Sequence, residues 1–260
     1  MDLGLSGKKA LVTGGSRGIG GAITRALLDE GVEVMASARD IESLTALKNE
    51  AEGKKLHHHS CDLTSAESRK SLVDRAIGEL KHVDILVHNV GGPKTSEVTS
   101  TSLSDWQEGF ERLFQSVVHL NEVFLPGMKE RGFGRIICVT SLSVIEPISG
   151  LAVSNALRSA VTSMLKTLAD ETAKYGVTVN CVAPGAIATE RLSDLMKARV
   201  AKSGQSEEEY MREYLSAIPA GRLGEPSEFA SVVAYLCSKQ AAYVTGSTIC
   251  VDGGKRRSTY

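Results

Sequence analysis

The sequence has few aromatic residues, few prolines and no excess of charge of either sign. Aromatic residues make up 5% of the 260 residues, the chain contains 6 prolines, and the formal net charge is −1 at pH 7. This balance argues against the strongly basic surface typical of nucleic-acid binding, and we expect a mixed, solvated surface with no nucleic-acid partner. No apolar run approaches the ~20 residues that a helix needs to cross a bilayer, so we expect no membrane partner either.

The cysteines show no spacing typical of a disulfide framework. They are Cys61, Cys138, Cys181, Cys237 and Cys250. An odd number without a Cys-x-x-Cys pair favours buried thiols in a reducing compartment. The first residues also lack the charged and apolar regions of a secretory signal. We therefore expect a cytoplasmic protein.

Three consecutive histidines, His57, His58 and His59, raise the question of a metal site. On a strand they would point to alternate faces of the sheet. No constellation of carboxylates or cysteines accompanies them. The sequence therefore predicts no metal.

The most informative segment is a glycine-dense turn at residues 13–20, which reads Thr-Gly-Gly-Ser-Arg-Gly-Ile-Gly. Glycines let the backbone turn sharply and approach a diphosphate, and the N–H groups at the start of the following helix supply donors. The alternative is an ordinary strand-to-helix turn. The context favours a nucleotide, because an apolar helical stripe and a second buried strand at residues 32–36 follow and predict a βαβ unit.

Strand and helix patterns alternate along the whole chain. We expect strands at residues 8–13, 33–37, 55–60, 85–89, 134–140, 178–183 and 248–251. The alternation predicts a single α/β domain over residues 1–260, with a Rossmann-type doubly wound parallel sheet of about seven strands and helices on both faces. Residues 186–223 break the rhythm with charged helical pieces, and we expect this excursion to cover the substrate.

Several motifs stand in the order and approximate spacing of one enzyme family. They are residues 13–20, Asp62-Leu63, Asn89-Val90-Gly91, Ser141, Pro184-Gly185 and residues 251–254. Through them the chain resembles the short-chain dehydrogenase/reductases over almost its whole length. It is particularly similar to the 3-oxoacyl-acyl-carrier-protein reductase branch, through residues 221–226 and 243–246. The resemblance implies a nicotinamide cofactor, a small-molecule carbonyl or alcohol substrate, and a homodimer or homotetramer.

The residues after the second strand bear on which nicotinamide cofactor binds. An acidic residue there suits the adenosine 2′-hydroxyl, whereas a 2′-phosphate requires cations. The chain offers Ser37-Ala38-Arg39, and Arg39 and Arg17 could both donate charge-assisted hydrogen bonds to one phosphate. The alternative is that Arg39 pairs with Asp40 or Glu42 on the surface. We expect NADP(H) in preference to NAD(H).

The resemblance also implies individual cofactor contacts. Those in the glycine turn are Gly14, Ser16, Arg17, Gly18, Ile19 and Gly20. Those elsewhere are Asp62 and Leu63 beside the adenine, Asn89 and Gly91 on the floor of the site, and Pro184, Gly185, Ile187 and Thr189 against the nicotinamide. His88 and Val90 depart from the Asn-Asn-Ala-Gly motif that the family has around Asn89.

The catalytic positions depart further from the family, whose members use an Asn, a Ser and a Tyr-x-x-x-Lys pair. Ser141 is retained, but Ser154 and Arg158 replace Tyr and Lys, and Leu113 stands at the position of the Asn. The spacing keeps Ser154 and Arg158 on one helix face. Serine is a much poorer acid than tyrosine, however, and arginine cannot relay a proton. The candidate catalytic residues are Ser141, Ser154 and Arg158, and Arg158 is also expected to bind the nicotinamide ribose.

Two classes of function remain open. The first is an NADP(H)-dependent oxidoreductase that interconverts a carbonyl and an alcohol by hydride transfer. In it Ser141 polarises the oxygen, and the proton comes from an atypical donor: Ser154, a water or Glu146. The second is an NADP(H)-binding family member without ordinary reductase activity, either a lyase-like enzyme or a regulatory or structural subunit.

Three other polar residues near the predicted site keep alternative interpretations. Glu146 precedes a proline in a loop, where an exposed glutamate is ordinary. His88 is expected to lie too deep to take part in catalysis. Arg191 could reach an anionic substrate from the excursion, or it could pair with Glu190 or Asp194 on the surface.

Overall fold

The computed structural model of the protein describes residues 2–259, so residues 1 and 260 of the predicted domain lie outside it. Its seven-stranded sheet has the order β3-β2-β1-β4-β5-β6-β7, and neighbouring strands are parallel. The strands are β1 (Lys9–Thr13), β2 (Glu33–Ala38), β3 (Leu56–Ser60), β4 (Ile85–His88), β5 (Gly134–Val139), β6 (Val177–Pro184) and β7 (Thr248–Val251). Each predicted strand lies within one residue of an observed one, so the predicted doubly wound parallel sheet is confirmed.

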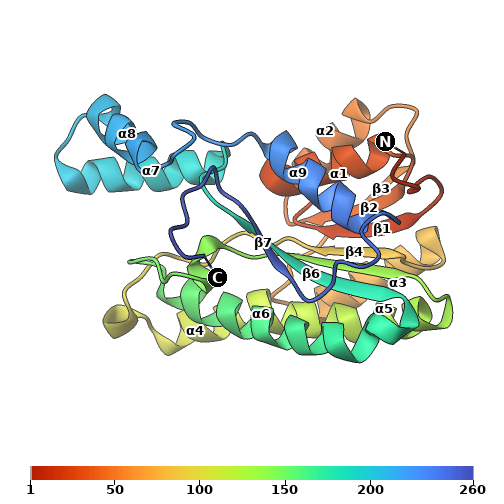
Figure 1. The fold of residues 1–260 in the computed structure, drawn as a ribbon. Helices are drawn as coiled ribbons and strands as arrows, with labels where there is room; N and C mark the ends of the chain where they lie inside the picture. Colours follow the sequence, from red (N-terminus) through yellow and green to blue (C-terminus); the bar gives the residue numbers. More distant parts are fainter. Residues whose placement is uncertain (1, 260) are drawn as a thin grey trace.

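Helices cover both faces of the sheet (Figure 1). One face carries α1 (Gly18–Asp29), α2 (Ile41–Glu50) and α9 (Pro226–Cys237). The other carries α3 (Ala66–Leu80), α4 (Leu103–Phe110), α5 (Ser116–Glu130) and α6 (Ala152–Thr172). The sheet is therefore the middle layer of three.

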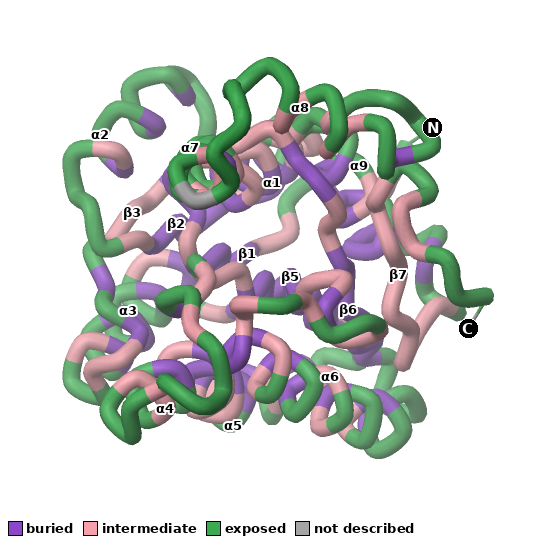
Figure 2. Tube along the Cα trace, turned by 90° about the vertical axis from the view of Figure 1, so that its left-hand side faces the viewer, coloured by how far each residue is buried: buried purple, intermediate pink, exposed green. Residues whose placement is uncertain are grey.

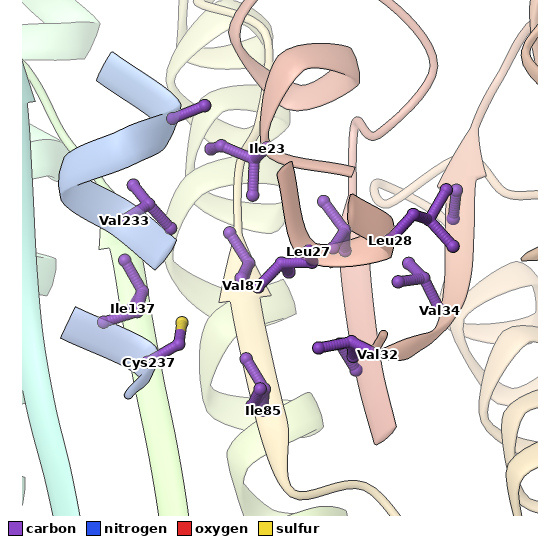
Figure 3. Packing of buried hydrophobic residues seen from close by; sticks show 14 of the residues in the cluster. Ile23, Leu27, Leu28, Val32, Val34, Ile85, Val87, Ile137, Val233 and Cys237 are labelled. Atoms are coloured by element: carbon purple, nitrogen blue, oxygen red, sulfur yellow. The ribbon is translucent and has the colours of Figure 1, made fainter. Parts of the chain in front are cut away.

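The strands supply apolar residues to two cores, one on each face. Val12 belongs to the core under α1 and α9, and its neighbour Leu11 belongs to the core on the opposite face. Successive residues of a strand point to opposite faces, so a strand buried on both sides reads as a continuous apolar run. Figure 3 shows Ile23 and Leu27 of α1 packed with Val233 of α9 in the first core.

Side-chain caps fix where many of the helices begin. The hydroxyls of Ser65 and Ser102 accept hydrogen bonds from backbone N–H groups in the first turns of α3 and α4. Ser206 and Glu209 form a reciprocal capping box at the start of α8 (Glu207–Ser216). Such caps satisfy N–H groups that have no partner within the helix.

The strand order reverses between β1 and β4. From β1 the chain winds outward to β2 and β3, and from β4 it winds the other way. In such sheets the crevice for a ligand lies outside the carboxyl ends of the strands at this reversal. Figure 2 views the molecule from the side of α7, with buried strand residues between two layers of helices.

The excursion at residues 186–223 contains α7 (Glu190–Ser203) and α8, which project from the body of the molecule (Figure 1). Its two ends are tied together, because the N–H of Ala188 donates to the carbonyl of Gly224 and the N–H of Gly224 donates to the carbonyl of Ala186. Among the described residues, no helix combines the length and the apolar character that crossing a bilayer requires.

Candidate active site

The glycine turn joins β1 to α1 at the reversal of the strand order. Gly14 and Gly18 have φ angles of +56° and +55°, in the left-handed region that favours glycine. A Cβ atom on Gly20 would lie 1.9 Å from the carbonyl oxygen of Gly14, so no side chain fits there. The close packing of the turn against itself and Asn89 therefore requires glycine at position 20.

The first turn of α1 lacks the side-chain cap found at α2, α3, α4, α7 and α8. Its N-cap residue is Arg17, which makes no capping hydrogen bond, and the first turn contains no acidic residue. Free N–H groups and the positive end of the helix dipole therefore face the turn. This combination binds anions, phosphate above all.

The predicted cofactor residue Asn89 is tied to the glycine turn. Its Nδ2 donates to the carbonyl oxygen of Gly14 at 2.9 Å, and its backbone N–H donates to Oγ1 of Thr13 at 3.1 Å. The ends of β1 and β4 are thus locked together beside the turn. The sequence predicts Thr13 as part of the turn but does not predict this hydrogen bond, although a polar residue at the end of an otherwise apolar strand is a signal for one. Gly91, by contrast, faces open space.

The two arginines predicted to bind a 2′-phosphate lie at the surface. Arg39 follows β2, is exposed, and forms no ion pair with any residue in the described range. Asp40 does not pair with it and instead caps α2, accepting from the N–H of Glu42 at 3.0 Å. Arg17 pairs with Glu190 at 3.2 Å, and both of these side chains are largely exposed.

The predicted adenine pair, Asp62 and Leu63, is held by neighbouring polar groups. Burial raises the pKa of Asp62, but hydrogen bonds from the backbone and hydroxyl of Thr64 outweigh it, so the pKa lies below its ordinary value. Arg69 of α3 is buried and donates from Nη1 to the carbonyl oxygen of Leu63 at 2.6 Å. No local sequence pattern distinguished Arg69 from other arginines.

The predicted nicotinamide segment follows β6. The N–H of Gly185 donates to the carbonyl of Val251 at 2.9 Å. Ile187 is buried, and Oγ1 of Thr189 accepts from the N–H of Leu192 to cap α7. A Cβ on Gly18 would lie 3.4 Å from the methyl group of Thr189. The structure therefore brings this segment against the glycine turn, although the two are far apart in the sequence.

Arg158 fixes the candidate catalytic end of α6 to the sheet. It is 8% exposed, and its Nη1 donates to the carbonyl of Val139 at 2.8 Å, while its Nη2 donates to the carbonyl of Val90 at 3.1 Å. Burial is the main cause of a pKa below the ordinary arginine value. The guanidinium joins the end of β5 to the segment after β4 and leaves further N–H groups for a ligand.

Ser154 and Ser141 supply the hydroxyls of the candidate site. Ser154 lies one turn before Arg158 on α6 and is 7% exposed, and its hydroxyl has no hydrogen-bond partner within residues 2–259. Ser141 follows β5, and its Oγ accepts from the N–H of Ser143 at 3.1 Å. Its own hydroxyl hydrogen remains available for donation.

Three further residues considered from the sequence offer no obvious proton donor. Glu146 is exposed, in agreement with the ordinary surface interpretation. Leu113 is buried in a π-helical segment between α4 and α5 and offers no polar group. His88 is buried, its Nε2 lies 2.9 Å from Oδ1 of Asn121, and burial lowers its pKa to about 4. Among the described residues, no group of three or more His, Cys, Asp or Glu is placed to hold a metal ion.

Comparison with known proteins identifies relatives over nearly the whole chain. A family model described as enoyl-(acyl carrier protein) reductase matches residues 14–256. The chain is 37% identical to a 3-oxoacyl-[acyl-carrier-protein] reductase of Vibrio cholerae over 252 residues, which cover 97% of this chain and 98% of that protein. It is 32% identical to a tropinone reductase homologue of Arabidopsis thaliana, covering 96% of this chain and 92% of the homologue.

Solved structures share the fold closely. L-sorbose reductase from Gluconobacter frateurii, solved with NADPH and L-sorbose, aligns with a TM-score of 0.94 at 30% identity, over 99% of this chain and 100% of that chain. A short-chain oxidoreductase from Pseudomonas aeruginosa PAO1, solved with NADPH and described as containing an atypical catalytic center, aligns at 0.88 with 32% identity, over 98% and 99% of the two chains. With its glycine turn, strand order and relatives in agreement, the chain belongs to the short-chain dehydrogenase/reductase family.

Proposed function

We propose that the protein is an NADP(H)-dependent oxidoreductase that interconverts a carbonyl and an alcohol by hydride transfer, with an atypical proton donor. The observation that carries this proposal is the pairing at α6. There the hydroxyl of Ser154, which has no hydrogen-bond partner among the described residues, lies one turn from the buried guanidinium of Arg158. This pair stands at the same edge of the sheet as the glycine turn. This placement supports a reaction site beside the proposed cofactor site.

The turn fits the diphosphate of a dinucleotide. Glycine at position 14 lets the backbone of Asn89 approach the turn, since a Cβ there would lie 2.5 Å from the Asn89 carbonyl oxygen, and the uncapped N-terminus of α1 offers N–H donors for a phosphate. The other residues expected to bind the cofactor are Ser16, Ile19, Asp62, Leu63, Gly91, Pro184, Gly185, Ile187 and Thr189. Their contacts with it remain predictions.

The preference for NADP(H) rests on charge. Arg39 follows β2 with no carboxylate at Ser37 or Ala38, and it is free of ion pairs within the described chain. Arg17 can leave its exposed pair with Glu190 at little cost in free energy, because exposed pairs contribute about 0–1 kcal/mol. The NADPH in the solved relatives supports the same preference.

When bound, NADPH supplies the hydride that reduces the carbonyl carbon. Ser141 is proposed to donate a hydrogen bond to the carbonyl oxygen, and Ser154 to donate the proton or to hold the water that donates it. Arg158 keeps its charge throughout, because an arginine guanidinium is not deprotonated in proteins. Its positive charge stabilises the negative charge that develops on the oxygen, and it favours ionisation of a nearby hydroxyl.

The proposal also covers the excursion beside the site and the assembly of the whole chain. Residues 186–223 are proposed to cover a small-molecule substrate, since their two ends are tied beside Ile187. We further propose that residues 1–260 form one domain that assembles as a homodimer or homotetramer in the cytoplasm.

A second function is a family member that binds NADP(H) without ordinary reductase activity. The observation that favours it is Leu113, which is buried where the family has a polar residue. With Ser154 and Arg158 in place of Tyr and Lys, three of the four usual groups are replaced. A lyase-like enzyme or a regulatory subunit would retain the cofactor turn and tolerate these changes.

The test measures NADPH binding by fluorescence and NADPH oxidation with a panel of ketones and aldehydes. For the oxidoreductase, Ser154→Ala is expected to lower kcat by ~10²–10⁴-fold, the usual contribution of a general acid, with little change in NADPH affinity. Ser159→Ala on the exposed side of α6 is the matched control and should leave kcat unchanged. Tight NADPH binding with no turnover of any carbonyl would support the second function instead.

A double variant, Ser154→Tyr with Arg158→Lys, tests whether the missing acid limits the native protein. A large gain in general reductase activity would show that it does. If the double variant binds NADPH but reduces no carbonyl, then Leu113 or the shape of the pocket also prevents reduction.

A further inference from the structure

Two guanidinium groups flank the four-residue segment that follows Asn89. Arg158 of α6 donates from Nη2 to the carbonyl oxygen of Val90 at 3.1 Å, and Arg191 of α7 donates from Nη2 to the carbonyl oxygen of Pro93 at 3.0 Å. A Cβ on Gly92 would lie 3.0 Å from Nη2 of Arg191, so the glycine lets the guanidinium lie directly against the backbone. Arg191 is thereby held at the candidate active site.

Neither guanidinium has an acidic partner in the part of the chain that the structure describes. Glu190 pairs with Arg17, and Asp194 forms no ion pair with any described residue. The surface alternative for Arg191, a pair with Glu190 or Asp194, is therefore not observed. The hydrogen bonds that Arg158 donates to Val139 and Val90 go to uncharged carbonyl oxygens.

The two positive charges are close enough to repel each other. The pKa of Arg158 is lowered mainly by burial, and Arg191 lowers it further. Like charges that converge without a counter-charge raise the free energy of the folded protein. A ligand with a negative charge at this place would offset both the repulsion and the loss of solvation.

We propose that the substrate carries a carboxylate that binds Arg191, with Arg158 adding to the positive potential, so that the substrate is an oxo acid or the corresponding hydroxy acid. This inference rests on the proposed oxidoreductase function. Arg191 is exposed, and Nη2 to Pro93 is its one side-chain hydrogen bond to the described residues, so N–H groups remain for a ligand. The planar fork of a guanidinium matches a carboxylate with two parallel hydrogen bonds. The carboxylate positions the carbonyl near Ser141 and Ser154 and takes no part in the bond changes.

The test compares matched substrates, a series of oxo acids and their methyl esters, in the wild type and in Arg191→Gln. We expect the wild type to favour the acids in kcat/KM. The substitution should reduce this preference by about 10- to 100-fold, as expected for hydrogen bonds to a charged group. The kcat/KM values for the esters and the affinity for NADPH should be unaffected. Arg191→Lys should restore part of the preference, and Lys197→Gln, which removes another positive charge from α7, should change nothing.

Three results would overturn the inference: equal kcat/KM for acids and esters in the wild type, an acid preference that survives Arg191→Gln, or a parallel loss of NADPH affinity that assigns Arg191 to the phosphates of the cofactor. A separate measurement does not depend on turnover. Saturated carboxylic acids and their amides are added to the complex with NADP⁺, and the shift in Tm is recorded. Stabilisation by acids alone, lost in Arg191→Gln, would support the anion site even if no carbonyl is reduced. No shift with any acid would count against it.

Discussion

Asn89 donates a hydrogen bond from Nδ2 to the carbonyl oxygen of Gly14 at 2.9 Å, and this bond joins the end of β4 to the turn after β1. Gly20 lies directly beside the same two groups. Its missing side chain leaves the space that the Asn89 amide and the Gly14 carbonyl occupy. The shape of the turn therefore depends on contacts among Gly14, Gly20 and Asn89, although Asn89 is far from the other two in the sequence.

Gly20→Ala is expected to disrupt the turn. The new Cβ would lie 1.9 Å from the Gly14 oxygen and 2.4 Å from Nδ2 of Asn89, so the backbone must move. Overpacking of this kind costs about 1–3 kcal/mol, and we expect NADPH affinity measured by fluorescence titration to fall at least about tenfold. Gly78→Ala in α3 meets no atom within 4 Å and is the control. It should stabilise the protein by up to about 1 kcal/mol and leave affinity unchanged. Normal NADPH binding by Gly20→Ala would contradict the assigned role of the turn.

Arg39→Ala is expected to weaken NADPH binding much more than NADH binding. The guanidinium is free of ion pairs within the described residues, and a charge-assisted hydrogen bond to the 2′-phosphate is worth about 10- to 100-fold in affinity. Dissociation constants for both cofactors give the measurement. Arg25→Ala, which removes an exposed arginine that pairs with Glu50, is the control for net charge. If Arg39→Ala weakens the binding of NADPH and NADH equally, Arg39 does not bind the 2′-phosphate.

The sequence predicts the fold well because its main signals are local. Apolar runs such as the one at Leu11 and Val12, each followed by a helical stripe, define βαβ units, and their alternation along the chain predicts a doubly wound parallel sheet. Contacts between distant segments are a different matter. Nothing near Arg191 indicates that its guanidinium binds the carbonyl of Pro93, and nothing near Arg17 indicates Glu190 as its partner. A surface arginine has many equivalent partners in sequence, and the folded backbone selects among them.

A side chain at Gly109 is expected to be destabilising, because α6 packs directly against α4 at this residue. A Cβ would lie 2.2 Å from Cγ1 of Val153 and 3.1 Å from Cδ1 of Leu157. Gly109→Ala should therefore lower the free energy of unfolding by about 1–3 kcal/mol. It should also lower kcat, because Val153 precedes the candidate catalytic Ser154. Chemical denaturation and steady-state kinetics give the two readouts.

Val153→Ala removes the methyl groups that the new side chain would strike. Combined with Gly109→Ala, it should recover stability relative to the sum of the two single changes, with a coupling free energy of at least about 0.5 kcal/mol. Simple additivity would mean that the helices move apart freely and that the close approach does not constrain α6.

His88 is expected to make the protein less stable in mild acid. Burial lowers the pKa of His88 to about 4, against 6.5 for an unperturbed histidine, and the hydrogen bond to Asn121 opposes this shift. As the pH falls from 6.5 to 4, the unfolded chain binds a proton that the folded protein does not, so stability decreases through this window and changes no further below it. The pKa difference corresponds to about 3 kcal/mol.

His88→Asn removes this titration and should flatten the difference in unfolding free energy over the same pH range. The partly exposed His59 provides the control, since His59→Asn should leave most of the pH dependence in place. If His88→Asn does not fold, NMR titration of the histidine ring signals in the wild type measures the same property. The His88 ring should remain neutral until the pH approaches 4, because the ring is buried and its hydrogen-bond partner among the described residues is the uncharged Asn121 amide. A ring that titrates near pH 6.5 in the folded protein would mean that water or an anion reaches it.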